Sequence, residues 1–149
     1  MVTAAQEVTK GRYYGFAGQI LYADLSTGII EIKPLDLDLA RKYLGGYGIA
    51  AKLIYDMVPP EVDPLSPENV IIFGGGALVG TMAPTGARST FISKSPTSGF
   101  VAFSNGGYMG DVLKWAGFDF IVIKGRSETP VYLEITDGEA KLRKADALT

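Results

Sequence analysis

Residues 74–119 read GGGALVGTMAPTGARSTFISKSPTSGFVAFSNGGYMGDVLKWAGFD, and the rest of the chain is organised around this stretch. Two glycine-rich clusters, 74–76 and 104–107, lie on either side of Arg88. Because glycine lacks a Cβ, the backbone there can turn tightly and approach a ligand closely. Free N–H groups at a helix start and a nearby guanidinium both suit an anion. The glycines alone would fit ordinary tight turns, but two clusters around an arginine favour a bound anionic ligand.

The composition describes a globular chain without a strong charge. It has 149 residues, of which 47% are hydrophobic and 20% charged, which fits one domain with a real core. The net charge of -2 argues against a nucleic-acid surface. No apolar run approaches the roughly 20 residues of a membrane span, and the N-terminus lacks the apolar core of a signal peptide. We therefore expect a cytoplasmic protein that binds neither nucleic acid nor membrane.

The chain contains no cysteine and no histidine, which excludes several kinds of site. No thiolate is present to ligate zinc or an iron–sulfur cluster. A Ser-His-Asp or Cys-His catalytic site is also excluded. Paired carboxylates occur at a helix start and in a proline-rich loop, where capping and solvation are their expected roles. We predict no catalytic residue and no protein-ligated metal in this chain.

Strand-like and helix-like segments do not alternate strictly, and strands outnumber helices. The predicted strands are 19–24, 29–33, 70–73, 89–93, 100–103, 120–123, 131–136 and 139–144, and the predicted helices are 37–44, 48–56 and 108–116. The last helix is predicted to bury Val112, Leu113, Trp115 and Ala116. This pattern predicts an α+β fold with two β-sheets and a few short helices. Hairpins at both ends also suggest an internally duplicated plan.

Several of these segments resemble, in order and spacing, the N-terminal domain of the tungsten-dependent aldehyde ferredoxin oxidoreductases. They include GFAGQILYADLSTG, LARKYLGGYGIAAKLIYD, APTGARS, SKSPTSGF and NGGYMGDVLKWAGFDFIVIKG. The resemblance extends from residue 15 to residue 149, which we take as the domain, and leaves residues 1–14 as an expected flexible extension. It implies that the two sheets form a base for a bis-pterin cofactor.

The resemblance also implies an activity. Members of this family are metal-binding electron-transfer enzymes that oxidise aldehydes to carboxylic acids and reduce ferredoxin. They hold tungsten, or sometimes molybdenum, between two pterins, with a magnesium ion bridging the pterin phosphates and a 4Fe-4S cluster beside one pterin. A chain without cysteine cannot ligate that cluster, so the ligands must come from outside it.

We therefore expect a cofactor-supporting domain that is inactive alone and works with the remaining domains or a partner subunit. It is either a fragment or a natural short subunit, and self-association as a homo-oligomer is open. The alternative is a cofactor-free assembly subunit, or one that binds a small anion, derived from this domain.

Four residues carry the site that the resemblance implies. Arg88 matches the arginine of the family's P-T-G-x-R motif, which lies between pterin and cluster. Asn105, Gly106 and Gly107 match the asparagine and glycines of its N-x-G-G motif, which meet the pterin–magnesium unit. This chain has one residue fewer between the asparagine and the glycine pair, so either Asn105 or Ser104 occupies the asparagine position. We choose Asn105 because an amide oxygen is the better ligand for a hard cation.

Overall fold

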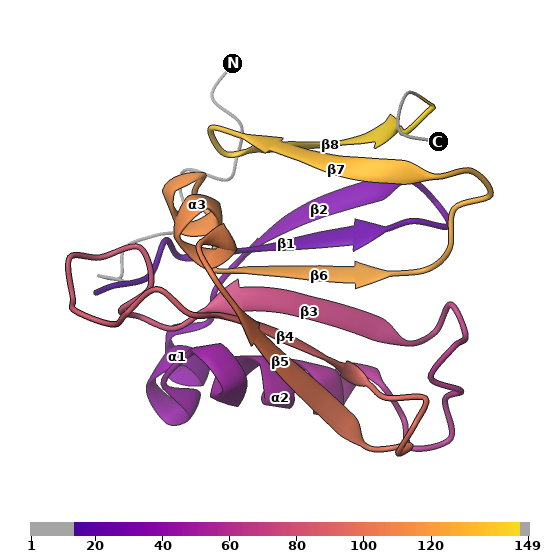
Figure 1. Ribbon diagram of the computed structural model, residues 1–149, viewed down its shortest axis with the longest axis horizontal. Helices are drawn as coiled ribbons and strands as arrows, with labels where there is room; N and C mark the ends of the chain where they lie inside the picture. Colours follow the sequence, from indigo (N-terminus) through magenta and orange to yellow (C-terminus); the bar gives the residue numbers. More distant parts are fainter. Residues whose placement is uncertain (1–13, 147–149) are drawn as a thin grey trace.

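A six-stranded mixed sheet forms the centre of the molecule, and a separate two-stranded hairpin lies over part of it (Figure 1). The computed structural model describes residues 14–146, so nearly all of the predicted extension at 1–14 lies outside the described part. The large sheet has the order β2-β1-β6-β3-β4-β5 and contains one parallel pair, β1 with β6. Its strands are β1 (Gln19–Asp24), β2 (Ile29–Pro34), β3 (Val70–Gly75), β4 (Ser89–Lys94), β5 (Val101–Gly106) and β6 (Phe120–Lys124).

Each face of this sheet is covered by a different layer. Helices α1 (Leu37–Tyr43) and α2 (Gly46–Met57) cover one face. Helix α3 (Met109–Trp115) and the hairpin of β7 (Val131–Thr136) and β8 (Glu139–Lys144) pack on the other. The observed architecture of two sheets and short helices confirms the predicted α+β class.

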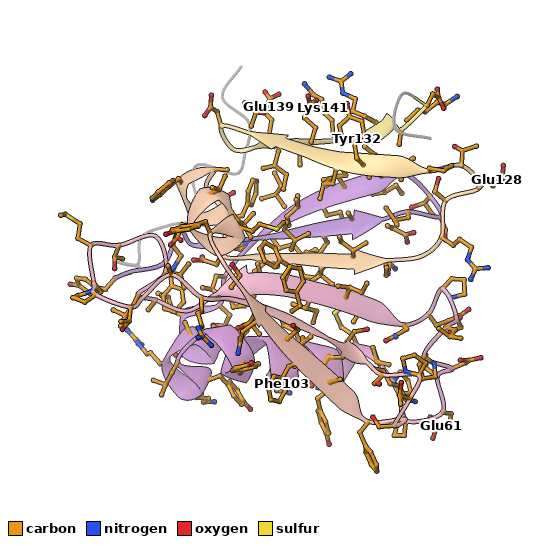
Figure 2. The ribbon with its side chains drawn as sticks, viewed as in Figure 1. Glu61, Phe103, Glu128, Tyr132, Glu139 and Lys141 are labelled. Atoms are coloured by element: carbon orange, nitrogen blue, oxygen red, sulfur yellow. The ribbon has the colours of Figure 1, made fainter. Side chains whose placement is uncertain are left out.

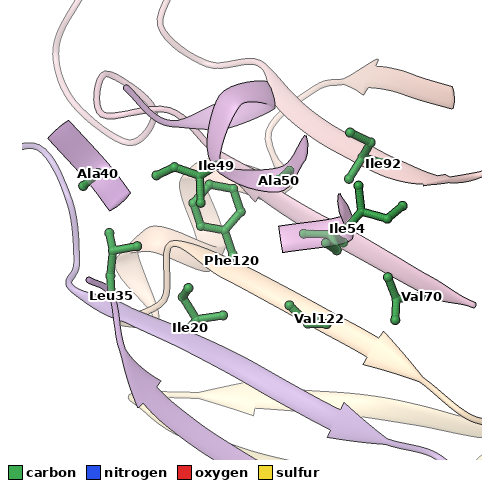
Figure 3. Close-up of a cluster of buried hydrophobic side chains, with 11 residues drawn as sticks. Ile20, Leu35, Ala40, Ile49, Ala50, Ile54, Val70, Ile92, Phe120 and Val122 are labelled. Carbon is green, nitrogen blue, oxygen red and sulfur yellow. The ribbon is translucent and has the colours of Figure 1, made fainter. Parts of the chain in front are cut away.

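Two apolar cores result from this layering, one on each side of the sheet. Figure 3 shows the larger one, in which Phe120 and Val122 of β6 meet Ile49 and Ile54 of α2. The intervening residue Ile121 faces the opposite core, since successive strand residues point to opposite faces. A strand covered on both faces reads as a continuous apolar run, which is why β3 and β6 were recognisable in the sequence.

The turns at both hairpins follow the sequence prediction. Between β7 and β8, Asp137 and Gly138 have φ of 48° and 83°, the left-handed pair of a two-residue turn that suits the twist of the strands. Between β1 and β2, Gly28 has φ of 72° and the Asp24 carboxylate accepts the N–H of Ser26 at 2.9 Å. Asp36 caps α1 by accepting the N–H of Asp38, as expected for a carboxylate at a helix start.

The predicted apolar face of the last helix is right for Leu113 but wrong for Val112 and Trp115. In α3, Val112 is 59% exposed and Trp115 is 70% exposed, whereas Leu113 and Asp111 are buried. The helix is rotated because Gly110 packs against Ser89, where an added Cβ would lie 2.8 Å from the Ser89 hydroxyl. Apolar periodicity in seven residues is too short a pattern to specify that rotation.

The second glycine cluster also lies differently from its prediction. Strand β5 continues to Gly106, so Ser104 and Asn105 are strand residues and not part of a turn. At the start of α3, the N–H of Gly110 donates to the Ser89 hydroxyl at 2.6 Å. This amide is therefore engaged within the fold and is not free to bind an anion.

Candidate functional site

A depression of about 500 Å³ lies where the start of α2, the loop between β3 and β4, and the end of β5 come together. Its lining is rich in glycine and small side chains: Leu44, Gly45, Gly46, Tyr47, Gly76, Ala77, Leu78, Val79, Thr85, Gly86, Arg88, Thr90 and Asn105. Arg88 is the single charged residue in this set, and it brings a positive charge to a surface of backbone and small groups. Two of the predicted site residues, Arg88 and Asn105, thus share one depression although they lie on different strands or loops.

Arg88 is held at the rim by a compact loop that ends at β4. Thr85 has φ of 62°, and at Gly86 an added Cβ would lie 2.7 Å from the Leu78 carbonyl oxygen. Only glycine fits that close approach without displacing backbone. The Arg88 side chain is exposed, and within residues 14–146 no hydrogen bond or ion pair engages its guanidinium. Its donors are therefore available to a ligand.

The strand register places Asn105 and Ser104 on different faces of the sheet. Asn105 is paired with Thr90, which is buried near Gly46 on the helical face of the sheet. Ser104 is paired with Phe91, whose ring packs on Phe73 at 4.5 Å in the opposite core. The two side chains therefore lie on opposite faces of the sheet, and only Asn105 lines the depression with Arg88.

Gly106 and Gly107 lie beside the depression but do not line it. Gly106 ends β5 and is paired with Ser89. The Gly107 carbonyl accepts the Ser89 hydroxyl at 2.8 Å, and an added Cβ at Gly107 would meet nothing within 4 Å. Both residues connect the depression to α3, and neither is constrained to be glycine by packing inside the described chain.

The sequence interpretation missed a third glycine pair, which it assigned only to the end of a helix. Gly45 has φ of 111° and forms an isolated bridge with Gly76, and a Cβ at Gly45 would lie 3.1 Å from the Gly76 Cα. Gly46 is the first residue of α2, where no side chain caps the helix. Free N–H groups at such a helix start carry partial positive charge. The doubled glycine was the available signal, but its proximity to Gly76 depends on the tertiary fold.

Tyr47 was also missed, and it has an unusual environment. Its ring packs edge-on against Phe103 of β5, with centroids 4.6 Å apart. Figure 2 shows Phe103 beside the helical layer of the molecule. The Tyr47 hydroxyl is buried without a hydrogen-bond partner in the described part of the chain. A buried hydroxyl without a partner is uncommon, so a polar group outside these residues would complete it.

The opposite side of Gly76 is supported by a buried ion pair. Lys114 of α3 donates to the carbonyl oxygens of Gly76 at 2.6 Å and Gly15 at 2.7 Å, and lies 3.7 Å from Asp119. Asp119 also accepts the N–H groups of Ala17 and Gly18, at 2.9 and 2.7 Å. Burial lowers the pKa of Lys114 and raises the pKa of Asp119, while their mutual attraction opposes both shifts. This pair is engaged by the fold and supports the depression from behind.

The described residues do not form a metal site from protein side chains alone. Between residues 14 and 146 there is no group of three or more Asp, Glu, His or Cys side chains placed to hold a metal ion. A hard cation at the depression would therefore rely on the Asn105 amide oxygen, backbone carbonyls or the ligand's own oxygens. None of the three helices in the described part has the length and apolar composition needed to cross a bilayer.

Comparison with known proteins gives consistent matches. The family model for the N-terminal domain of aldehyde ferredoxin oxidoreductase matches residues 20–149. A tungsten-containing aldehyde ferredoxin oxidoreductase from Pyrococcus furiosus is 47% identical over 133 residues, which cover 89% of this chain and 22% of that protein. The corresponding protein from Thermococcus kodakarensis is 45% identical over 136 residues, covering 91% and 22%. This chain therefore spans 22% of the length of these two relatives.

A solved structure shows the same fold. A chain of the active site complex BamBC of benzoyl coenzyme A reductase, in complex with 1,5-dienoyl-CoA, superposes with a TM-score of 0.88 at 42% sequence identity. The superposition covers 91% of this chain and 21% of that one.

Proposed function

Because the chain belongs to the aldehyde ferredoxin oxidoreductase family and matches its N-terminal domain, we propose that it forms one wall of a tungsten–pterin site. The larger enzyme would oxidise aldehydes to carboxylic acids with ferredoxin as the electron acceptor. In this proposal residues 15–149 supply binding and electrostatics, and molybdenum is an alternative to tungsten.

The observation that carries the proposal is the free guanidinium of Arg88 beside Asn105 in a glycine-lined depression. A pterin cofactor bears phosphate, and an unpaired arginine next to closely approachable backbone fits such an anion. Asn105 would offer an amide oxygen to a magnesium ion held with the cofactor. Gly46 leaves room beside the backbone, since the nearest atoms to an added Cβ there are 3.8 Å away. When bound, the metal and pterin supply the redox chemistry, and the chain's residues hold and orient the group.

The proposal assigns a second role to Arg88. A guanidinium stays charged at working pH, so it would favour an electron-rich neighbour electrostatically. The 4Fe-4S cluster proposed beside it must be ligated by thiolates from other domains or a partner subunit, because this chain has no cysteine. The 149-residue chain alone should accordingly oxidise no aldehyde with any acceptor, and turnover by it would contradict the proposal.

The test is Arg88→Ala in the complete enzyme. Loss of a charged hydrogen bond costs about 1.5–3 kcal/mol, which corresponds to roughly tenfold to hundredfold weaker cofactor retention. Tungsten and pterin content, together with ferredoxin-linked turnover, measure this. Arg88→Lys should recover part of the function, since it restores the charge but not the planar fork.

A matched control is Arg126→Ala, because Arg126 is also exposed but does not line the depression. Arg126→Ala should retain the full cofactor content. If Arg88→Ala retained as much tungsten and pterin as Arg126→Ala, Arg88 would be an ordinary surface charge and the site assignment would fail.

A second candidate concerns the substrate. The chain of the benzoyl coenzyme A reductase complex is 42% identical to this one, nearly as similar as the aldehyde oxidoreductases. The same cofactor-supporting wall could therefore serve reduction of a coenzyme A thioester. Assays of the complete enzyme with aldehydes and with aromatic coenzyme A thioesters distinguish the two. Purified enzyme that contains neither tungsten nor molybdenum would instead favour the cofactor-free assembly or anion-binding subunit.

A further inference from the structure

Helix α3 engages both backbone polar groups of Gly80, in the middle of the loop that leads to Arg88. The buried Asp111 carboxylate accepts the Gly80 N–H, and the Trp115 indole N–H donates to the Gly80 carbonyl at 3.0 Å. Gly80 has φ of 75°, and an added Cβ would lie 3.4 Å from Lys114 side-chain carbons and from the Trp115 nitrogen. The loop is therefore seated directly on the helix.

The same helix is tied to the far end of that loop. Ser89, which follows Arg88, accepts the N–H of Gly110 at 2.6 Å and donates to the carbonyl of Gly107 at 2.8 Å. One short helix thus fixes the chain on both sides of Arg88. Two attachments limit how far the loop can open locally, because local opening must break both.

Hydrogen bonds within the loop connect Gly80 to the part of the loop that lines the depression. Thr81 donates from its hydroxyl to the Leu78 carbonyl at 2.7 Å, and Ala83 donates its N–H to the Thr81 hydroxyl at 3.2 Å. Gly86 donates to the Ala83 carbonyl at 3.2 Å and packs on Leu78. A shift of Gly80 would therefore move the turn from which Arg88 projects.

Packing alone does not explain why an aspartate occupies this place. Asp111 is 6% exposed, and its second carboxylate oxygen has no hydrogen-bond partner among residues 14–146. Burying a carboxylate is costly unless it is well paired, and an apolar residue of similar size is often more stabilising. Trp115 is 70% exposed, so burial does not account for it either. The contact that the two side chains share is Gly80.

We propose that Asp111 and Trp115 are positioning residues, which hold Gly80 so that Arg88 keeps the geometry that binds the anionic part of the cofactor. This inference rests on the proposed function, but its first consequence does not need the cofactor. It predicts that losing either contact loosens the loop and then weakens cofactor retention, without either side chain contacting the cofactor.

The experiment compares Asp111→Ala, Asp111→Asn and Trp115→Phe in the complete enzyme. Val112→Ala is the matched control, because Val112 is an exposed apolar residue of the same helix. Hydrogen exchange of the Gly80 amide, followed by mass spectrometry, reports the contact. Asp111→Ala should speed that exchange by about tenfold to a hundredfold, the range expected for one hydrogen bond to a charged group. The tungsten and pterin content of Asp111→Ala should fall severalfold. Asp111→Asn should keep an exchange rate and a cofactor content near those of the wild type, because its amide oxygen still accepts the hydrogen bond.

The outcomes separate this inference from the proposed function. If the hydrogen-exchange rate of the Gly80 amide is unchanged in Asp111→Ala, the Asp111 contact does not hold Gly80 and the inference is wrong. Faster exchange with full cofactor retention overturns the positioning role, provided that Arg88→Ala does lose cofactor. If Arg88→Ala also retains it, the proposed function itself fails. If Asp111→Ala does not fold, Trp115→Phe provides the test, because Trp115 is exposed and its substitution should not prevent folding. The positioning role then requires that Trp115→Phe lose more cofactor than Val112→Ala.

Discussion

Lys114 and Arg88 lie near the two ends of one loop, and the fold engages them in opposite ways. The Lys114 side chain is 9% exposed, bonds two backbone carbonyls and faces Asp119. Arg88 is exposed, and no residue between 14 and 146 engages its guanidinium. A buried charge must be paired within the chain, whereas an exposed one beside bare backbone can remain available. Lys114 therefore serves the structure, whereas the Arg88 guanidinium remains available to a ligand.

The largest expected effect comes from breaking the buried pair. Asp119→Ala removes the acceptor of two backbone N–H groups and leaves Lys114 without its counter-charge. Removing one partner of a buried pair typically costs about 3–5 kcal/mol of unfolding free energy. Urea unfolding of the chain measures this. Asp119→Asn should lose less, since it keeps an acceptor, and a loss below about 1 kcal/mol in Asp119→Ala would show that the pair is dispensable.

The next effect tests which glycines are required by packing. A Cβ at Gly74 would overlap the Phe120 ring and lie 2.5 Å from the Asp119 carbonyl oxygen. Gly74→Ala should therefore destabilise by about 1–3 kcal/mol or more through overpacking. Gly107→Ala is the control, because nothing lies within 4 Å of its added Cβ. Equal melting temperatures for the two variants would contradict this reading.

A smaller effect distinguishes the two faces of β5. Asn105→Ala in the complete enzyme should weaken cofactor retention by about twofold to tenfold, the range for one neutral hydrogen bond. Ser104→Ala should leave retention unchanged, because Ser104 faces the opposite side of the sheet. Pterin and magnesium content of the two variants, measured side by side, check this. The reverse order would assign the family's asparagine position to Ser104.

The smallest expected effect is the change in stability when Arg88, the exposed cation compared above with Lys114, is removed. Arg88→Ala should change the unfolding free energy by less than about 0.5 kcal/mol, as is usual for exposed substitutions without special contacts. A melting curve of the chain is sufficient. A loss above about 1.5 kcal/mol, close to that of a broken charged hydrogen bond, would mean that Arg88 supports the fold as Lys114 does.

The sequence by itself determined the elements and the identity of the fold. Continuous apolar runs marked β3 and β6, and Asp137 and Gly138 marked the closing turn. The ordered family segments predicted that Arg88 and Asn105 belong to one site, and both residues line the same depression. The apolar runs and the turn are local patterns, and the family segments are recognised by their order along the chain. Neither kind of signal depends on how the chain packs.

Only the tertiary structure decided how those residues combine. The face on which Asn105 lies follows from its pairing with Thr90, and the role of Gly45 follows from its bridge to Gly76 across the fold. The rotation of α3, which buries Asp111 and exposes Trp115, follows from contacts with Gly80 and Ser89. Seven residues of periodicity carry too little information to orient a helix, and contacts between residues distant in sequence are set by packing and register.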